Sequence, residues 1–372
     1  MIRSYKYRIY PNKEQTRILN EQLETHRILY NNSLAERKNA WEERTESLSC
    51  FRQINRLPQL CQDNVYIKKC NYSSLQQTLR RLDKTYKKFF KEHCGYPRFK
   101  SKDRFNTIAY NILGNGCQIK EHKLYLQHVG LIKVKWHREL PCKPKTLSIT
   151  HRSDKWYVNL MLELPDQELL PKANRVVGID LGLKSFAITS DGEFIESPKY
   201  LRKLEQKLAK AQHKLCRRKK GSNRRAKARK QVANVHEHIS NQRKDFCHKE
   251  SRKLINTYDS IAVEDLQIQN MVKNRHLSKS ISDSGWGLFL RYLSYKAESA
   301  GRQFVKVDPR NTSQKCSQCG EIVKKSLAVR VHKCPHCGLV LDRDINAAIN
   351  ILKSAWTEPS GDNVEVLNSC VA

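Results

Sequence analysis

The sequence predicts a multidomain α/β protein that also contains a small β-barrel. Short segments of strand type gather between residues 105 and 164. From residue 175 onward, short apolar runs alternate with long helical patterns, which is typical of a separate α/β domain. A chain of 372 residues is long enough for two or three domains with their own cores.

The N-terminal segment combines one strand with two long helices. Apolar residues alternate over residues 1–10, which predicts a strand, and Pro11 precedes a helical pattern that runs to about residue 43. A second long helix is predicted from Ser73 to Lys91, and Gly95 and Pro97 follow it as breakers. Its apolar stripe comprises Leu75, Leu79, Leu82, Tyr86, Phe89 and Phe90.

The next segment predicts the barrel. Five short strands are expected at residues 107–110, 123–126, 131–134, 147–150 and 156–161. Residues 1–10 would supply an extra strand, so the helices would be an insertion after it. Residues 165–174 have the composition of a linker.

The C-terminal half begins with three adjacent strands at 175–181, 184–190 and 193–196. A long helical region (199–256), a strand (259–264), a helix (285–300), a strand (303–307) and a last helix (344–354) follow. Three adjacent strands followed by alternating helices and strands is the order of an RNase H-like fold. The tail from about Glu358 lacks periodicity, so we expect it to be disordered.

Three acidic residues lie where a metal-dependent nuclease would require them. Asp180 and Glu264 each end a short apolar run, and Asp344 opens the last helical pattern. Such a fold could gather the three carboxylates around Mg²⁺, which prefers oxygen ligands. Two Mg²⁺ ions about 4 Å apart can stabilise both the attacking and the leaving oxygen of a phosphodiester. A single acid at a strand end is usually only solvent-exposed, but the joint pattern is more specific.

Four cysteines form a zinc motif between the second and third acids. Two C-x2-C pairs are separated by fourteen residues, and they comprise Cys316, Cys319, Cys334 and Cys337. Four thiolates fill a tetrahedral Zn²⁺, so this site should be structural rather than catalytic. A redox dithiol pair is the alternative. His332 and His336 are expected not to be ligands. The other nine cysteines are scattered, which indicates a reducing cytosol.

The charge balance indicates a polyanionic partner. Lys and Arg number 70 against 37 Asp and Glu, which gives a formal charge of +33. Each phosphate that a basic group neutralises releases counterions and strengthens binding. No apolar run reaches the roughly 18 residues that a membrane span requires. The first fifteen residues lack the apolar segment of a secretory signal, so we expect no membrane association and a cytoplasmic location.

The most basic segment is residues 202–230, which contain fourteen Lys or Arg and a single acid. Leu204, Leu208, Ala211 and Leu215 repeat at helical spacing beneath this basic surface. We interpret the segment as a helical hairpin, turning at Gly221-Ser222-Asn223, that faces a phosphate backbone. A solvated helix face is the alternative. The expected contacts are Arg217, Arg218, Lys219, Lys220, Arg224 and Arg225.

Taken together, these stretches resemble TnpB, the transposon-encoded RNA-guided nuclease related to type V CRISPR effectors. The matching residues include Gly178-Ile179-Asp180-Leu181-Gly182, Val263-Glu264-Asp265-Leu266, the segment 280–287, the four cysteines, and residues 342–348. Residues 7–12 and 96–100 match as well. The resemblance covers nearly the whole chain and is most specific from 175 to 352.

The resemblance implies a domain organisation. Residues 171–310 and 340–357 would form a RuvC-like nuclease domain with Asp180, Glu264 and Asp344 as its acidic triad. Residues 311–339 would be an inserted zinc ribbon that binds target nucleic acid. A wedge β-barrel (1–12 and 100–170) would carry an inserted helical recognition domain (13–99). The tail would comprise residues 358–372.

The resemblance also implies partners and cofactors. A guide RNA from the transposon end would pair with double-stranded target DNA beside a short motif read by the protein. Mg²⁺, as two ions, and one structural Zn²⁺ would be the metals, in a prokaryotic cytoplasm and with no obligate protein partner evident. Contacts to nucleic acid are expected at Gln76, Arg80, Arg98 and Lys100, although a solvated role is equally open for the first two.

Two other functions fit the same fold. A non-catalytic nucleic-acid-binding regulator would be favoured by a missing acid, but all three acids are present. A transposase is the other alternative, and no separate module for binding transposon ends is identifiable. Asp342 lies two residues before Asp344, and the match to the family favours Asp344 as the metal ligand. An acid at position 344 could also serve only as a helix cap.

Overall fold

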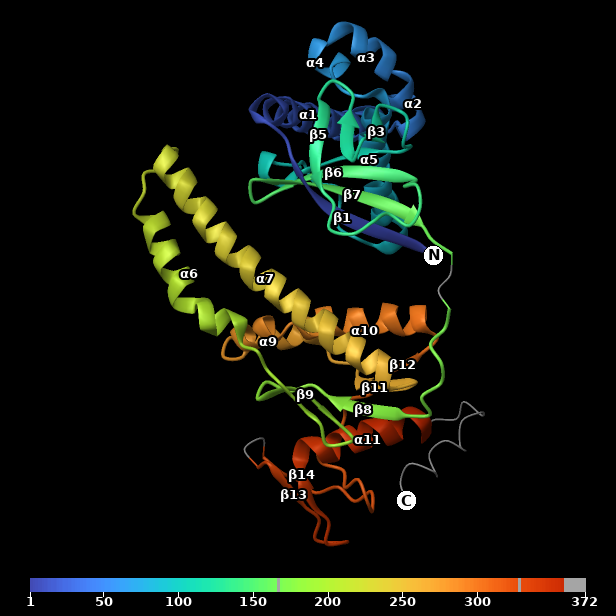
Figure 1. Cartoon of the computed structure of the whole chain (residues 1–372), viewed down its shortest axis with the longest axis vertical. Helices are drawn as coiled ribbons and strands as arrows, with labels where there is room; N and C mark the ends of the chain where they lie inside the picture. Colours follow the sequence, from blue (N-terminus) through green and yellow to red (C-terminus); the bar gives the residue numbers. More distant parts are fainter. Residues whose placement is uncertain (166–167, 327–328, 358–372) are drawn as a thin grey trace. The chain divides into compact units, whose positions relative to one another are not determined.

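The computed structural model describes residues 1–165, 168–326 and 329–357. The chain divides into two compact units, Met1–Pro165 and Asp166–Ala372 (Figure 1). Each unit has its own sheet and its own hydrophobic core. The expected disordered tail, 358–372, lies outside the described residues.

The first unit is built on a curled antiparallel sheet of seven strands in the order β2-β6-β7-β1-β5-β4-β3. The strands are β1 (Ile2–Tyr10), β2 (Thr107–Tyr110), β3 (Cys117–Lys120), β4 (Lys123–Leu126), β5 (Gly130–Lys135), β6 (Thr146–Arg152) and β7 (Lys155–Glu163). The N-terminal strand β1 pairs with both β5 and β7, so it joins the two halves of the sheet. All five strands expected between 105 and 164 are present, and β3 is one that the sequence pattern missed.

Five helices lie between β1 and β2 in the chain. They are α1 (Lys13–Arg44), α2 (Cys50–Asn55), α3 (Leu57–Asp63), α4 (Val65–Lys68) and α5 (Tyr72–Glu92), and a 3-10 turn, η1 (Lys102–Arg104), follows. Helix α1 begins at a capping box, because Asn12 and Gln15 satisfy each other's backbone N–H groups. On α5, Leu75, Leu79 and Leu82 are buried as expected. Phe90 was expected on the same stripe but is 70% exposed, because the helix extends beyond the core.

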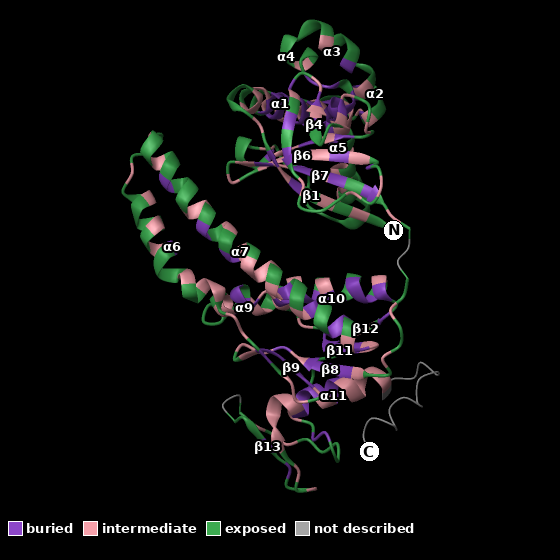
Figure 2. Ribbon diagram, viewed as in Figure 1, coloured by how far each residue is buried: buried purple, intermediate pink, exposed green. Residues whose placement is uncertain are grey.

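The second unit contains a five-stranded sheet in the order β10-β9-β8-β11-β12. The strands are β8 (Val176–Asp180), β9 (Ser185–Thr189), β10 (Phe194–Glu196), β11 (Ser260–Glu264) and β12 (Gln303–Val307). β8, β9 and β10 pair antiparallel, whereas β11 runs parallel to both β8 and β12. Figure 2 shows β8 and β11 as largely buried strands, as their continuous apolar runs require.

Helices cover both faces of this sheet (Figure 1). The helices of this unit are α6 (Tyr200–Cys216), α7 (Asn223–Thr257), α8 (Ile268–Met271), α9 (Ser278–Ser284), α10 (Trp286–Ala300) and α11 (Arg343–Thr357), of which α6 packs on α7 rather than on the sheet. One core packs α7 and α10 against β8 and β11 through residues such as Leu254, Phe289 and Val263. The opposite face carries α11, whose Ile351 packs with Ala262 and Val307. A two-stranded ribbon, β13 (Val331–Lys333) and β14 (Val340–Asp342), precedes α11.

Gly178 sets how closely α11 approaches the sheet. A Cβ atom at this position would lie 2.1 Å from the carbonyl oxygen of Ala348 and 2.7 Å from the amide nitrogen of Leu352. Both atoms belong to the backbone of α11, so no side-chain rotation can relieve the overlap. A residue with any side chain would therefore displace the helix from β8.

We expect Gly178→Ala to destabilise the second unit strongly. Overpacking of a core typically costs about 1–3 kcal/mol, and a clash against backbone should reach the upper end of that range or exceed it. The measurement is thermal or urea unfolding. Gly287→Ala is the matched control, because its Cβ would lie at an ordinary 3.5 Å from Ile268. Equal stability of Gly178→Ala and wild type would contradict the close packing of α11.

Among the described residues, no helix combines the length and apolarity needed to cross a lipid bilayer.

Candidate active site and zinc centre

Asp180 and Glu264 end neighbouring parallel strands. Val263 pairs with Ile179 in the register of β11 and β8, so the next residue of each strand is the acid. Because parallel strands end at the same edge of a sheet, the two carboxylates emerge side by side. The structure thus brings together two acids that are 84 positions apart in the sequence.

The face on which the two acids lie follows from strand alternation. Residues two apart on a strand point to the same face. Gly178 faces α11, and Ala262 packs with Ile351 of that helix. Asp180 and Glu264 therefore point to the face that α11 covers. Asp344 lies in the first turn of α11, at the edge where those strands end.

The electrostatics of Asp180 indicate that Glu264 and Asp344 both lie near it. Burial, followed by the nearby carboxylates of Glu264 and Asp344, raises the pKa of Asp180 to about 7. The Arg343 guanidinium acts in the opposite sense. A buried carboxylate whose charge two other carboxylates disfavour is a suitable environment for a divalent cation, which would relieve the repulsion.

Glu264 is held by a neighbouring hydroxyl. Its side chain is only 8% exposed, and burial raises its pKa. Thr312 Oγ1 donates a hydrogen bond of 2.6 Å to Glu264 Oε1, which favours the ionised form and fixes the carboxylate. Thr312 follows β12 by five positions and is itself buried. Nothing in the sequence pattern had indicated Thr312.

Asp344 is engaged by two arginines. Arg343 Nε donates to one carboxylate oxygen at 2.9 Å, and Arg330 Nη1 donates to the other at 3.3 Å. Arg330 lies just before β13, in the cysteine-containing segment. These guanidinium groups balance the charge of Asp344 in the structure.

The helix cap is Asp342, not Asp344. Asp342 Oδ1 accepts from the backbone N–H of Asp344 at 2.8 Å and from that of Ile345 at 3.3 Å. A side-chain oxygen that accepts from these first amides is the standard N-cap arrangement. The capping role considered for Asp344 is therefore filled by its neighbour, and the Asp344 carboxylate is left to the acidic cluster.

The four cysteines form the tightest group of potential metal ligands. Within the described part of the chain, Cys316, Cys319, Cys334 and Cys337 are the group whose ligand atoms all lie within 4.8 Å of one another. The sulfur atoms of Cys316 and Cys337 are 3.6 Å apart, and those of Cys319 and Cys334 are 3.5 Å apart. Four sulfurs at 2.3 Å from Zn²⁺ would be about 3.8 Å apart, so the group can hold zinc. The three carboxylates are more widely spaced than this.

Two similar turns build the cysteine group. The amide of Cys316 donates to the carbonyl of Glu321, and the amide of Cys334 donates to that of Leu339. Gly320 and Gly338 adopt positive φ values of 82° and 75°, which non-glycine residues rarely do. His332 is buried and bonds to Lys325 through Nδ1, so it does not join the cysteines.

Two asparagines connect the cysteine segment to α11. Asn346 Oδ1 accepts from the amide of Ser317 at 2.9 Å, and its Nδ2 donates to the carbonyl of Lys315 at 2.8 Å. One turn later, Asn350 Nδ2 donates to the carbonyls of Thr312 and Lys315. Both asparagines are nearly fully buried. The sequence analysis did not single them out, although two polar residues four apart on an apolar helix face were a usable signal.

Comparisons with known proteins identify the family. A model described as "Probable transposase" matches residues 159–275, one described as "Cas12f1-like, TNB domain" matches 286–351, and a "Helix-turn-helix domain" model matches 1–46. A "Putative RNA-guided DNA endonuclease" of Streptomyces pristinaespiralis is 35% identical, over 97% of this chain and 92% of that protein.

The chain belongs to the TnpB family.

More distant relatives of this TnpB-family chain extend the comparison. A protein of Escherichia coli strain K12 named "Putative RNA-guided DNA endonuclease InsQ" is 27% identical, over 94% of this chain and 92% of that one. The solved structure titled "Cryo-EM structure of the Cas12f1-sgRNA-target DNA complex" covers 95% of this chain and 99% of its own at 17% identity, with a TM-score of 0.37.

The basic segment of the TnpB-family chain forms the expected hairpin. Helix α6 ends at Cys216 and α7 begins at Asn223, with Ser222 as its cap. Leu208 is buried against Val235 and Ile239 of α7. Among the described residues, no ion pair engages the six predicted contacts. Four of these are exposed: Arg217, Lys219, Lys220 and Arg224.

Arg225 differs from the others. It is half-buried, and its Nη1 donates to the carbonyls of Leu215 at 3.0 Å and Arg218 at 2.8 Å. These bonds close the tip of the hairpin. Its position therefore supports a structural role more than a direct phosphate contact.

The remaining predicted contacts of the TnpB-family chain lie in the first unit. Arg80 and Arg98 are exposed, and Gln76 is half-buried on α5. The backbone of Lys100 is fixed to α1, because its amide donates to Asn31 Oδ1 and its carbonyl accepts from Arg27 and Asn31. Among the described residues, no hydrogen bond or ion pair joins these four side chains to one another.

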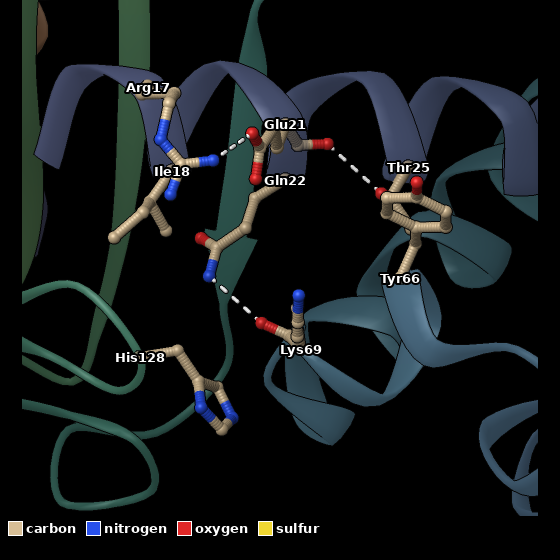
Figure 3. Close-up of a pocket in the computed structure, with 8 residues that line it drawn as sticks. All are labelled: Arg17, Ile18, Glu21, Gln22, Thr25, Tyr66, Lys69 and His128. Carbon is tan, nitrogen blue, oxygen red and sulfur yellow. Dashed lines mark hydrogen bonds and ion pairs between the residues drawn. The ribbon is translucent and has the colours of Figure 1, made fainter. Parts of the chain in front are cut away.

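A cavity of about 280 Å³ lies in the same unit, between α1, α4 and the turn after β4 (Figure 3). Gln22 donates to the carbonyl of Lys69 at 3.1 Å along one side. Arg17 pairs with Glu21, and His128 faces the opening with a positive φ of 65°. The sequence analysis did not predict this cavity, because its residues come from three separate segments.

Proposed function

We propose that this protein is an RNA-guided DNA endonuclease that cleaves target DNA next to a short flanking motif. The observation that carries the proposal is the convergence of Asp180, Glu264 and Asp344 at one edge and one face of the sheet. The formal charge of +33 suits a protein that binds both RNA and DNA. Relatives over nearly the whole length are named as endonucleases of this kind.

The proposed domains follow the expected boundaries. Residues 171–310 and 340–357 would be the RuvC-like nuclease domain, with the zinc ribbon at 311–339. The strand order β10-β9-β8-β11-β12, antiparallel and then parallel, supports an RNase H-like domain. Residues 1–12 and 100–170 would form the wedge barrel around the recognition helices of 13–99.

Asp180, Glu264 and Asp344 would hold Mg²⁺ as two ions. The donor set fits, because three carboxylates at one edge of the sheet offer the hard oxygen ligands and negative charge that Mg²⁺ requires. When bound, Mg²⁺ would activate water and neutralise charge on the phosphate.

The surrounding residues would fix the carboxylates. Thr312 holds Glu264 in one orientation through its hydroxyl. Asp342 caps α11, which sets the position of Asp344 at the start of the helix. Arg330 and Arg343 balance the charge of Asp344 and could be released as a cation enters.

One zinc ion per chain is expected at the cysteine group. Cys319→Ser removes one of four ligands, and since the free energy of structural zinc binding contributes to folding, it should lower both zinc content and stability. Elemental analysis of purified protein measures the metal. Cys216→Ser, a similarly exposed cysteine outside the group, should retain zinc. Active wild-type protein free of zinc would show that this assignment is wrong.

The basic hairpin is expected to contact phosphates. Replacing Arg217, Arg218, Lys219 and Lys220 by alanine should weaken nucleic-acid binding with little regard to sequence. The log–log salt dependence should flatten by roughly 0.7–0.9 per lost contact. The charge-conserving control Arg217→Lys/Arg218→Lys should keep the slope. A slope that the alanine variant leaves unchanged would favour the solvated-surface interpretation.

Expression from the native locus tests the proposed function directly. RNA that copurifies with the protein would be sequenced, and a plasmid matching its guide region would be offered in Mg²⁺. Double-strand cleavage of that plasmid alone is the expected result. Binding without cleavage would support the regulator alternative, and strand-transfer products would support the transposase.

A further inference from the structure

A smaller, polar cavity lies in the second unit, next to the loop that follows Asp180. Its volume is about 230 Å³. It is bounded by the loop after β8, the loop between β10 and α6, and helix α9. The lining residues are Leu183, Lys184, Ser197, Lys199, Arg202, Ser280, Asp283 and Ser284.

We propose that this cavity binds a backbone phosphate of the DNA strand being cleaved. The inference rests on the proposed endonuclease function and adds a positioning site to it. It assigns a role to residues 280–287, a motif that the resemblance matched but that the acids and cysteines do not explain.

Three cations converge on the cavity. Lys184, Lys199 and Arg202 are exposed, and among the described residues none of them forms an ion pair. Glu205, the acid nearest to Arg202 along α6, is itself paired with Lys279. The charges of Lys184 and Lys199 are therefore available to an anion from solvent, whereas Arg202 is also attracted by Glu205.

The one carboxylate in the wall is already satisfied. Asp283 accepts from the backbone amide of Leu201 at 3.1 Å and pairs with Arg243 at 2.8 Å. Arg243 Nε also donates to the carbonyl of Asp283 at 2.8 Å. Arg243 thus neutralises the charge of Asp283, so Asp283 does not repel a phosphate that enters the cavity.

The polar lining suits a phosphate rather than a base. Ser197 and Ser280 supply hydroxyl donors, whereas Leu183 is the single apolar side chain in the wall. A nucleobase would need an apolar or aromatic face on which to stack, and none lines this cavity. Phosphate oxygens accept hydrogen bonds from hydroxyl and ammonium groups alike.

The scaffold behind the cavity is rigid. By accepting the amide of Leu201, Asp283 caps α6, whose own N-cap residue, Lys199, contributes no side-chain bond. Gly285 allows Arg243 to reach Asp283, because a Cβ there would lie 2.6 Å from Arg243 Cδ. Lys199, the N-cap residue, adopts a φ of 48° in the left-handed region.

The position along the chain indicates which phosphate would bind. Lys184 is four residues from Asp180, so their Cα atoms are at most about 14 Å apart. At a rise of about 3.4 Å per nucleotide, this corresponds to a phosphate within roughly four nucleotides of the cleaved bond. The bound strand would therefore be the one that enters the acidic cluster.

The first test is a triple variant, Lys184→Gln/Lys199→Gln/Arg202→Gln, in the complex with guide RNA. We expect it to raise the KM for target DNA about tenfold, since charge-assisted hydrogen bonds are the strong ones. Guide-RNA binding and the unfolding temperature should stay as in wild type. A charge-matched control, Lys123→Gln/Lys143→Gln/Lys172→Gln, removes three exposed cations elsewhere. An equal effect of the two triple variants would overturn the proposal, because general charge would then explain it.

The second test replaces single phosphates of the target strand by neutral methylphosphonates. Wild type should lose about tenfold in kcat/KM at one linkage within roughly four nucleotides of the cut. The triple variant Lys184→Gln/Lys199→Gln/Arg202→Gln should show no further loss of kcat/KM when that linkage is neutral. No sensitive linkage in wild type, or full sensitivity in the variant, would overturn the site while leaving the endonuclease function intact. If the wild-type protein cleaves no DNA, the proposed endonuclease function is wrong. In that case, equal affinity of the wild-type protein and the triple variant for single-stranded DNA would show that the phosphate site is wrong as well.

Discussion

Asp180→Ala protein is expected to cleave no target DNA in Mg²⁺ while it binds guide RNA as tightly as wild type. Asp180 lies at the centre of the acidic cluster, since its pKa responds to both Glu264 and Asp344. Loss of one metal-holding carboxylate removes several kcal/mol of transition-state stabilisation, which lowers the rate at least about a thousandfold. The basic hairpin that would hold nucleic acid is untouched by the change.

Single-turnover assays measure the loss of DNA cleavage, and filter binding measures the affinity for guide RNA. Glu264→Gln should behave like Asp180→Ala. Asp265→Asn is the matched control, because Asp265 is next to Glu264 but is exposed and paired with Lys306. Cleavage at the wild-type rate by Asp180→Ala would remove the catalytic assignment altogether. Chelation of divalent metal by EDTA should stop the wild-type reaction.

Substitution of the neighbouring acids Asp342 and Asp344 is expected to have very different effects on DNA cleavage. Asp344→Asn should abolish cleavage, because an amide lacks the charge that holds Mg²⁺. Asp342→Asn should retain substantial activity, because asparagine caps a helix as well as aspartate does. Asp342→Ala should cost about 1 kcal/mol of stability through the lost cap.

Cleavage assays at matched stability and matched RNA binding make this comparison. Asp342 accepts the amides of Asp344 and Ile345, so its substitution tests the cap alone. If Asp342→Asn were inactive and Asp344→Asn active, the third catalytic carboxylate would have been placed on the wrong residue.

Local patterns were enough to predict most of the elements and the gathering of the acids. Asp180 and Glu264 end apolar runs, and parallel pairing of such runs brings their ends to one edge. The cysteine pairs were equally readable, because their ligands lie close together in sequence. The short strand β3 was missed, since four residues with one buried apolar side chain give little periodic signal.

Residues that act through long-range contacts could not be predicted. Thr312 reaches Glu264, and Asp283 reaches the amide of Leu201, only because separate segments fold together. Arg225 was expected to face phosphate, yet it closes the hairpin tip on backbone carbonyls. A basic residue in a basic run gives no sign of which neighbour it will contact.

The buried asparagines of α11 link the cysteine group to Glu264 of the acidic cluster through a chain of hydrogen bonds. Asn350 holds the carbonyl of Thr312, and the hydroxyl of Thr312 holds Glu264. Asn346 holds the backbone on either side of Cys316. Because of these hydrogen bonds, we expect a ligand that orders the cysteine segment to order the side chain of Glu264 as well. Zinc bound by the cysteines would thus help to hold the carboxylate of Glu264 in position, although the zinc would take no part in the chemistry.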